Sequence, residues 1–156
     1  MKQRPSFLKE IQITFKKRRV KNGAPVDEPI TDPEQVFSLF EDLQNEMKEK
    51  VICIALDAKL KILCFEVVAI GSRNAVYLKP VEVIRTALPW NPEGFIIVHN
   101  HPSGDPSPSE ADITFTDKLN QAIQTLGCKL FDHVIIGDGC YFSFTEEGLL
   151  HASGNE

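Results

Sequence analysis

The 156-residue sequence has no apolar run that approaches the ~18 consecutive residues of a membrane-spanning helix, so we expect no transmembrane segment. No apolar segment follows its basic N-terminus, and we therefore expect no secretory signal. The four cysteines are widely spaced and include no Cys-x-x-Cys pair. In a chain without a secretory signal, this spacing is typical of reduced thiols in the cytoplasm and argues against a disulfide framework.

Apolar residues make up 42% of the chain, and the net charge is only −5. This balance excludes disorder throughout and suffices for one domain with an ordinary core. The charge is uneven, because residues 1–22 hold eight Lys or Arg and one acid, whereas the rest of the chain carries −12. Such an arm is able to bind nucleic-acid phosphates, but basic residues are also common at strand edges, and the arm is equally able to pack against the acidic body.

Composition and turn signals divide the chain into a basic arm and linker over residues 1–30, one domain over 31–150, and a frayed polar tail over 151–156. Within the arm, alternation of apolar and polar residues predicts a short strand over residues 11–15. The linker is rich in Pro, Gly and acidic residues, which separates the arm from the domain.

Inside the domain, Asp32, Pro33 and Gln35 have the chemistry of a helix start, and apolar spacing predicts a helix from there to Lys48. Further strands are expected at residues 51–56, 62–69, 76–78, 95–98, 130–136 and 141–144, and further helices at 80–88 and 110–126. Because strands and helices alternate in mixed order, we expect an α/β fold: a mixed, partly antiparallel central sheet with flanking helices.

Two of the four histidines, His99 and His101, follow an apolar strand and are separated by one residue. In an extended chain their side chains point the same way, so both are able to contact one ligand. Asp112 lies in the first turn of the next helix, three residues after Ser109. Two imidazoles and one carboxylate suit a Zn²⁺ site that keeps a fourth position for water. The alternative is that Ser109-x-x-Asp112 is only a helix cap.

The pattern His99-x-His101-x(7)-Ser109-x(2)-Asp112 matches the JAMM (MPN+/JAB) metalloprotease motif. The segments His101-Pro102-Ser103-Gly104 and Asp132-His133-Val134-Ile135-Ile136-Gly137 resemble the RadC-type branch of that superfamily. The resemblance covers residues 33–150. It implies the three-layer, deaminase-like JAB fold, with His99, His101 and Asp112 as zinc ligands and Ser109 as the residue that steadies the oxyanion.

The superfamily also has a glutamate upstream of the histidines that acts as general base and acid. Its position before the first sheet strand favours Glu49, while Glu66 is the rival and Glu46 a third candidate. We interpret His133 as a core residue or a hydrogen-bonding support of the site rather than a ligand.

The resemblance implies a zinc-dependent hydrolase that cleaves a peptide or isopeptide bond of a protein substrate in the cytoplasm, with no membrane partner. The alternative is a RadC-type, DNA-repair-associated factor with a structural or vestigial zinc and DNA contacts through residues 2–21. A zinc nuclease fits less well, because two-metal sites need more carboxylates. Full-length RadC proteins resemble this domain preceded by a helix-hairpin-helix module, which residues before Pro33 lack, so we expect a stand-alone domain. The sequence favours no oligomeric state.

Overall fold

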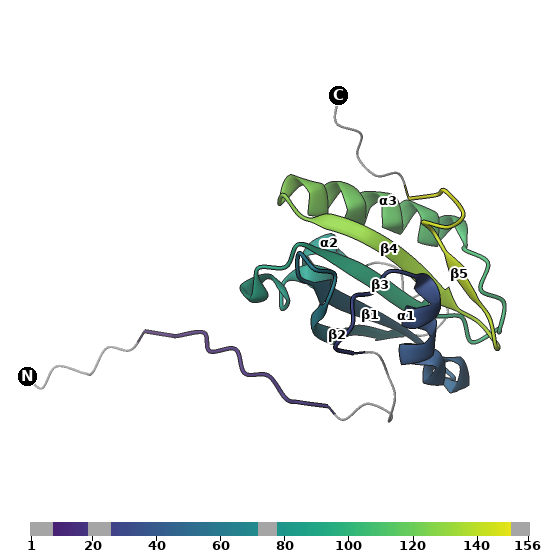
Figure 1. Cartoon of the computed structure of the whole chain (residues 1–156), viewed down its shortest axis with the longest axis horizontal. Helices are drawn as coiled ribbons and strands as arrows, with labels where there is room; N and C mark the ends of the chain where they lie inside the picture. Colours follow the sequence, from purple (N-terminus) through teal and green to yellow (C-terminus); the bar gives the residue numbers. More distant parts are fainter. Residues whose placement is uncertain (1–7, 19–25, 72–77, 151–156) are drawn as a thin grey trace, which may run out of the picture.

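The computed structural model describes residues 8–18, 26–71 and 78–150. They build a five-stranded sheet in the order β2-β1-β3-β4-β5 (Figure 1). Neighbouring strands are antiparallel except β3 and β4, which run parallel. The sheet therefore has the mixed, partly antiparallel character that the sequence predicts. The strands are β1 (Glu49–Leu56), β2 (Ile62–Gly71), β3 (Gly94–Asn100), β4 (Lys129–Ile136) and β5 (Tyr141–Ser143).

Helices cover both faces of the sheet, as expected for three layers (Figure 1). Alternate residues of β1 enter two separate cores, because successive side chains of a strand point to opposite faces. One core includes the helices α2 (Pro80–Ile84) and α3 (Glu110–Thr125), and the other includes α1 (Pro33–Phe40) and the 3-10 helix η1 (Glu41–Asn45). A second 3-10 helix, η2, spans Leu88–Trp90. Among the described residues, no helix is long and apolar enough to cross a membrane.

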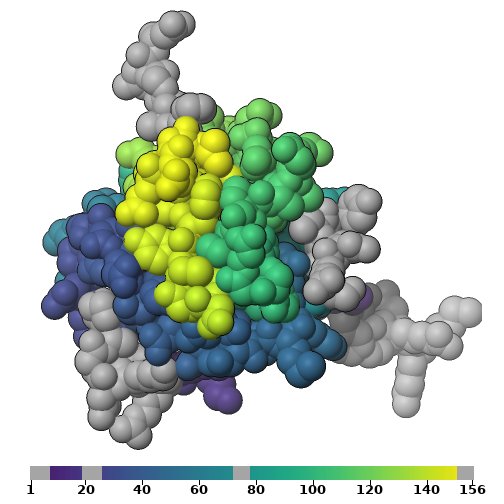
Figure 2. Space-filling model, turned by 90° about the vertical axis from the view of Figure 1, so that its right-hand side faces the viewer, coloured from purple at the N-terminus to yellow at the C-terminus, as the bar shows by residue number. Residues whose placement is uncertain are grey.

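The parallel pair β3 and β4 is joined by the crossover helix α3. Residues 101–109 therefore leave the carboxyl end of β3 and lead into the N-terminus of α3 at the same end of the sheet. Figure 2 views the molecule from the side, where the green segment before α3 lies beside the yellow segment that contains β5. Backbone hydrogen bonding confirms the contact, because Asp138 N donates to Gly104 O at 2.9 Å. Open α/β sheets place ligands at this end of their parallel strands.

The helix predicted to reach Lys48 is wrong in its second half. It ends at Phe40 and continues only as η1, and Glu49 already opens β1. The cause lies in the neighbouring strand, because the side-chain amide of Asn100 binds the backbone on both sides of Glu49 and holds it extended. Tertiary hydrogen bonds thus override helical spacing at this point. The helix predicted over residues 80–88 is also shorter, and α2 ends at Ile84.

The strand predicted at residues 11–15 is wrong as well. Residues 8–18 form no strand, and Ile11 is 87% exposed. A strand needs a partner for its backbone groups, and none of the described strands pairs with this segment. Phe15 instead contacts Trp90, with ring centroids 4.5 Å apart and the rings tilted by 55°. Of the strand predicted at 76–78, Leu78 is not in a strand, and the other two residues lie outside the described residues, as do parts of the basic arm and the whole tail 151–156.

The burial of the cysteines generates a test of this fold. Cys53 lies in β1 within the α3-side core, and burial raises the pKa of its thiol to about 12, whereas Cys140 is exposed beside β5. Because alkylation requires an accessible thiolate, iodoacetamide at neutral pH will modify Cys140 in the native protein and Cys53 only after unfolding. Peptide mapping by mass spectrometry with and without denaturant measures this difference. Equal native labelling of both thiols would contradict the assigned core.

Candidate metal centre

The histidines predicted to form the site lie at the carboxyl end of β3. All seven β3 residues are buried, and His99 is paired with Val51 of β1. His99 therefore points to the α3 side of the sheet, where Val51 also enters the core. His101 is the first residue after β3 and is still tied to the sheet, because its backbone N donates to Ile136 O at 2.9 Å. The central strand thus fixes both rings.

Asp112 approaches the histidines from α3. Ser109 is the N-cap of this helix, and its Oγ accepts a hydrogen bond from Asp112 N at 3.2 Å. The buried stripe of α3 begins at Asp112 and continues at helical spacing through Phe115, Thr116, Leu119 and Ile123. The carboxylate is therefore directed into the molecule. Ser109 and Asp112 therefore do form a helix cap, as the alternative interpretation predicts. The cap also directs the Asp112 carboxylate into the cluster, so it is compatible with a metal site.

Glu49 comes from the first residue of β1 and is held by a residue that sequence reasoning missed. Asn100 Oδ1 accepts from Lys50 N at 2.8 Å, and Asn100 Nδ2 donates to Lys48 O at 3.2 Å. Its fully buried amide thus forms hydrogen bonds with the residues on both sides of Glu49, and we call this pair of bonds the Asn100 clamp. The sequence offered one signal, because Asn100 separates the two histidines in the alternating strand pattern and must face differently from them.

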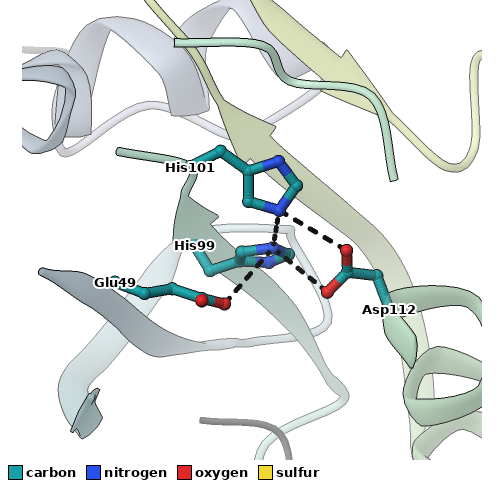
Figure 3. A group of neighbouring side chains, drawn as sticks. All are labelled: Glu49, His99, His101 and Asp112. Carbon is teal, nitrogen blue, oxygen red and sulfur yellow. Dashed lines mark hydrogen bonds and ion pairs between the residues drawn. The ribbon is translucent and has the colours of Figure 1, made fainter. Parts of the chain in front are cut away.

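The four side chains converge on one point from three elements and the loop after β3 (Figure 3). One ligand-type atom from each of Glu49, His99, His101 and Asp112 lies within 4.8 Å of the others. His99 Nε2 is 3.0 Å from His101 Nε2, 3.3 Å from Asp112 Oδ1 and 3.8 Å from Glu49 Oε1. His101 Nε2 is 3.4 Å from Asp112 Oδ2. This buried cluster has the chemistry to bind a metal ion.

The hydrogen bonds of His101 indicate why a cation suits this point. Its Nδ1 lies 2.9 Å from the backbone carbonyl oxygen of Asp105, which only accepts hydrogen bonds. The proton of a neutral His101 ring is therefore on Nδ1, and Nε2 presents a lone pair toward His99 Nε2. Nitrogen atoms this close repel one another unless a proton or a metal ion lies between them. The donor set of two imidazoles and two carboxylates fits a divalent metal.

Electrostatics hold the carboxylate charged and one imidazole neutral. Burial would raise the pKa of Asp112, but hydrogen bonding with His101, the nearby His99 and the bonds from Ser109 outweigh it and hold this pKa well below its usual range. Burial lowers the pKa of His99 to about 4. For His101, burial is outweighed by the hydrogen bonds to Asp112 and Asp105 and by the Asp112 charge, which raise its pKa. A charged carboxylate beside neutral imidazole is the ionisation state in which these groups bind metals.

Glu49 has the opposite perturbation from Asp112. Burial raises the pKa of Glu49, the negative charge of Asp112 raises it further, and the charge of His101 only partly opposes these effects. Of the three groups around His99 Nε2, Glu49 is also the most distant. A carboxylate with a raised pKa within the cluster is suited to accept and return a proton.

The other candidate residues do not belong to this cluster, although His133 contacts it from behind. Glu66 lies midway along the edge strand β2, where it is paired with Cys53, and it accepts a hydrogen bond from the Thr86 hydroxyl. Glu46 forms an ion pair with Lys50 at 2.5 Å. His133 is buried behind the cluster, and its Nε2 lies 2.7 Å from His99 Nδ1, on the ring edge that faces away from His101. The geometry thus groups Glu49, rather than Glu66 or Glu46, with the histidines.

A family model described as a RadC-like JAB domain matches residues 30–149, which include all four residues of the cluster. The chain belongs to the RadC-like JAB domain family. This confirms the resemblance carried by the histidine, serine and aspartate spacing, and the sheet with flanking helices is consistent with the JAB/MPN fold. The JAB-domain family includes metalloproteases, and this is consistent with a possible metal site at the cluster.

Curated relatives share this region. A "UPF0758 protein" of Aquifex aeolicus is 44% identical over 121 residues, which cover 78% of this chain and 52% of that protein. A protein of the same name from Methanosarcina mazei is 46% identical over 129 residues, covering 80% of this chain and 56% of the relative. The chain thus spans about half the length of the curated relatives it matches. Their printed names state no activity.

The Asn100 clamp generates a test of how Glu49 is held. Replacement Asn100→Leu leaves the Lys50 N–H and the Lys48 carbonyl without this partner, so we expect the free energy of unfolding to fall by about 1–3 kcal/mol. Asn120→Leu, at a half-buried position of α3 whose amide oxygen accepts a hydrogen bond from Gln124, is the matched control and should change it by less than about 0.5 kcal/mol. Urea denaturation measures both. Equal stability of the two variants would contradict the clamp.

Proposed function

We propose that this chain is a zinc-dependent hydrolase of amide bonds, with His99, His101 and Asp112 as the zinc ligands. The observation that carries the proposal is the pair of Nε2 atoms 3.0 Å apart beside the Asp112 carboxylate. Zinc–nitrogen and zinc–oxygen bonds of about 2.0–2.2 Å at tetrahedral angles separate neighbouring ligand atoms by about 3.3–3.5 Å. The three separations of 3.0, 3.3 and 3.4 Å lie close to that range, so the residues fit zinc.

When bound, zinc lowers the pKa of a coordinated water toward ~7 and polarises a carbonyl, which supplies a nucleophile at neutral pH. Glu49 Oε1 lies 3.8 Å from His99 Nε2, farther than the nearest atoms of His101 and Asp112, so we take those two residues and His99 as the ligands. We assign Glu49 as the general base that takes a proton from the attacking water and then delivers it to the leaving amine. Burial and the charge of Asp112 raise the pKa of Glu49, which makes its carboxylate a stronger base toward that water.

Ser109 is proposed to steady the oxygen of the attacked carbonyl. Its hydroxyl hydrogen is directed to Asp112 Oδ2 at 2.6 Å, and its oxygen caps α3. Rotation about the Cβ–Oγ bond redirects this hydrogen without moving the oxygen, so the helix cap is kept while the developing negative charge receives a donor. The substrate of such chemistry is a peptide or isopeptide bond, whose poor leaving group requires the proton that Glu49 supplies.

DNA binding through residues 2–21, the alternative function, stays a prediction. Within the described part of the arm, Lys9, Lys16, Lys17 and Arg18 keep it basic, and Arg18 lies over the ring of Phe65 with its guanidinium 5.9 Å from the centroid. These contacts lie on a segment that is separate in sequence from the cluster, so the amide hydrolase and the basic arm are independent hypotheses.

Metal uptake and hydrolysis test the proposal together. Metal-stripped protein should take up about one Zn²⁺ per chain in equilibrium dialysis, and His99→Ala and Asp112→Ala should abolish this uptake. Glu49→Gln should retain zinc but lose hydrolysis of a peptide or isopeptide library by about 10²–10⁴-fold, because the general base is gone. The matched control Glu66→Gln should retain both zinc and activity. Full activity of Glu49→Gln would remove Glu49 from the mechanism, and no uptake by the parent protein would overturn the zinc site.

The two roles of Ser109 are separable by substitution, with hydrolysis measured at saturating zinc. Ser109→Ala should lower the free energy of unfolding by about 1 kcal/mol through the lost cap, whereas Ser109→Gly should lower it by only a few tenths. Both should reduce kcat by about 10²–10³-fold, since neither offers a hydroxyl. Thermal unfolding and initial rates measure the two effects. Normal kcat in the glycine variant would show that Ser109 only caps the helix.

A further inference from the structure

Behind the metal cluster lies a buried pair of side chains to which the proposed mechanism assigns no role. His133 of β4 is 1% exposed and is stacked on Phe144, with ring centroids 4.8 Å apart. Its Nε2 lies 2.7 Å from His99 Nδ1, and its Nδ1 lies 2.6 Å from Thr116 Oγ1. Thr116 is fully buried on α3. These contacts form a continuous chain of hydrogen bonds from α3 through β4 to β3.

The direction of this chain follows from its α3 end. Thr116 Oγ1 donates to the backbone carbonyl oxygen of Asp112 at 2.6 Å. A hydroxyl has one hydrogen, and a carbonyl oxygen has none, so Thr116 accepts at its second contact. The hydrogen between Thr116 Oγ1 and His133 Nδ1 therefore belongs to the histidine. Thr116 thus selects the tautomer of His133 that is protonated at Nδ1.

The same logic carries one ring further. The apolar surroundings of His133 disfavour an imidazolium, so a ring protonated at Nδ1 has a bare Nε2 that accepts a hydrogen bond. The hydrogen between His133 Nε2 and His99 Nδ1 then belongs to His99. A neutral His99 protonated at Nδ1 keeps the lone pair of Nε2, which is the atom nearest to His101 and Asp112.

We propose that Thr116 and His133 are positioning residues that set the tautomer of His99, so that its Nε2 lone pair is directed into the cluster. His101 reaches the same tautomer directly, through the backbone carbonyl of Asp105. His99 Nδ1 instead contacts the side chain of His133, which Thr116 orients in turn. One turn of α3 thereby contributes twice, because Asp112 faces the cluster and Thr116, four residues later, orients His99 from behind.

The tautomer is a property of the metal-free protein, whereas its use as a ligand rests on the proposed zinc function. Long-range ¹H–¹⁵N correlation spectra of the full, metal-stripped chain with ¹⁵N-labelled histidine distinguish protonated from bare ring nitrogens. We expect His99 and His133 to be protonated at Nδ1 and bare at Nε2. Protonation of His99 at Nε2 would overturn the inference whatever the chain does with zinc. The expected tautomers in a chain that binds no zinc would uphold it and overturn the proposed function instead.

Two matched variants test the hydrogen-bond chain from Thr116 through His133 to His99, which we call the relay. Thr116→Val removes the hydroxyl at nearly constant shape, while Thr116→Ser retains it. We expect the valine variant to bind Zn²⁺ about 10–100-fold more weakly in competition with a chelator, the range found when groups that orient metal-binding histidines are lost. The serine variant should bind as the parent does. Equal zinc affinity of the valine variant and the parent would contradict the relay. If the valine variant does not fold, the histidine tautomers measured in the parent protein decide whether the relay exists.

Discussion

Two imidazole nitrogens, His99 Nε2 and His101 Nε2, are held 3.0 Å apart in a buried position beside a charged carboxylate. Such an arrangement is unfavourable for the rings alone, because two nitrogen lone pairs face one another, and it becomes favourable once a cation occupies the space they share. The surrounding structure holds the two rings in this orientation. A backbone carbonyl fixes one ring, a histidine and a threonine contact the other, and a helix cap directs Asp112 toward both.

The parallel β3–α3–β4 unit explains how residues distant in sequence come together in the cluster. Because α3 is the crossover between two parallel strands, its N-terminus returns to the end of the sheet where β3 releases the histidines. Antiparallel β1 brings its first residue, Glu49, to the same end, where the Asn100 amide extends the hydrogen bonding of the two strands beyond their last paired residues. The four groups therefore share one location although Glu49 and Asp112 are far apart in sequence.

The predictable part of this molecule is what local pattern determines. Apolar strand patterns located β1, β3 and β4, the helix predicted over residues 110–126 matches α3, and the histidine spacing with Ser109 and Asp112 led to the cluster. Helical spacing wrongly placed Lys48 in a helix. The hydrogen bonds that hold this segment extended come from Asn100, 50 residues from Lys50, and a local pattern cannot reveal them. The alternation of apolar and polar residues over 11–15 favoured a strand, but it does not show whether a partner strand is present to pair with it. The role of Thr116 was equally hidden, since a buried threonine in a helix carries no pattern until its neighbours are known.

The most direct test of the account is the coordination of the ion itself. X-ray absorption at the zinc edge of the zinc-loaded chain should detect two imidazole nitrogens and carboxylate or water oxygens, with no sulfur, and His101→Ala should lose one imidazole from the shell. A coordination shell that contains sulfur, or one that keeps both imidazoles in that variant, would contradict the assignment of His99, His101 and Asp112 as the metal centre.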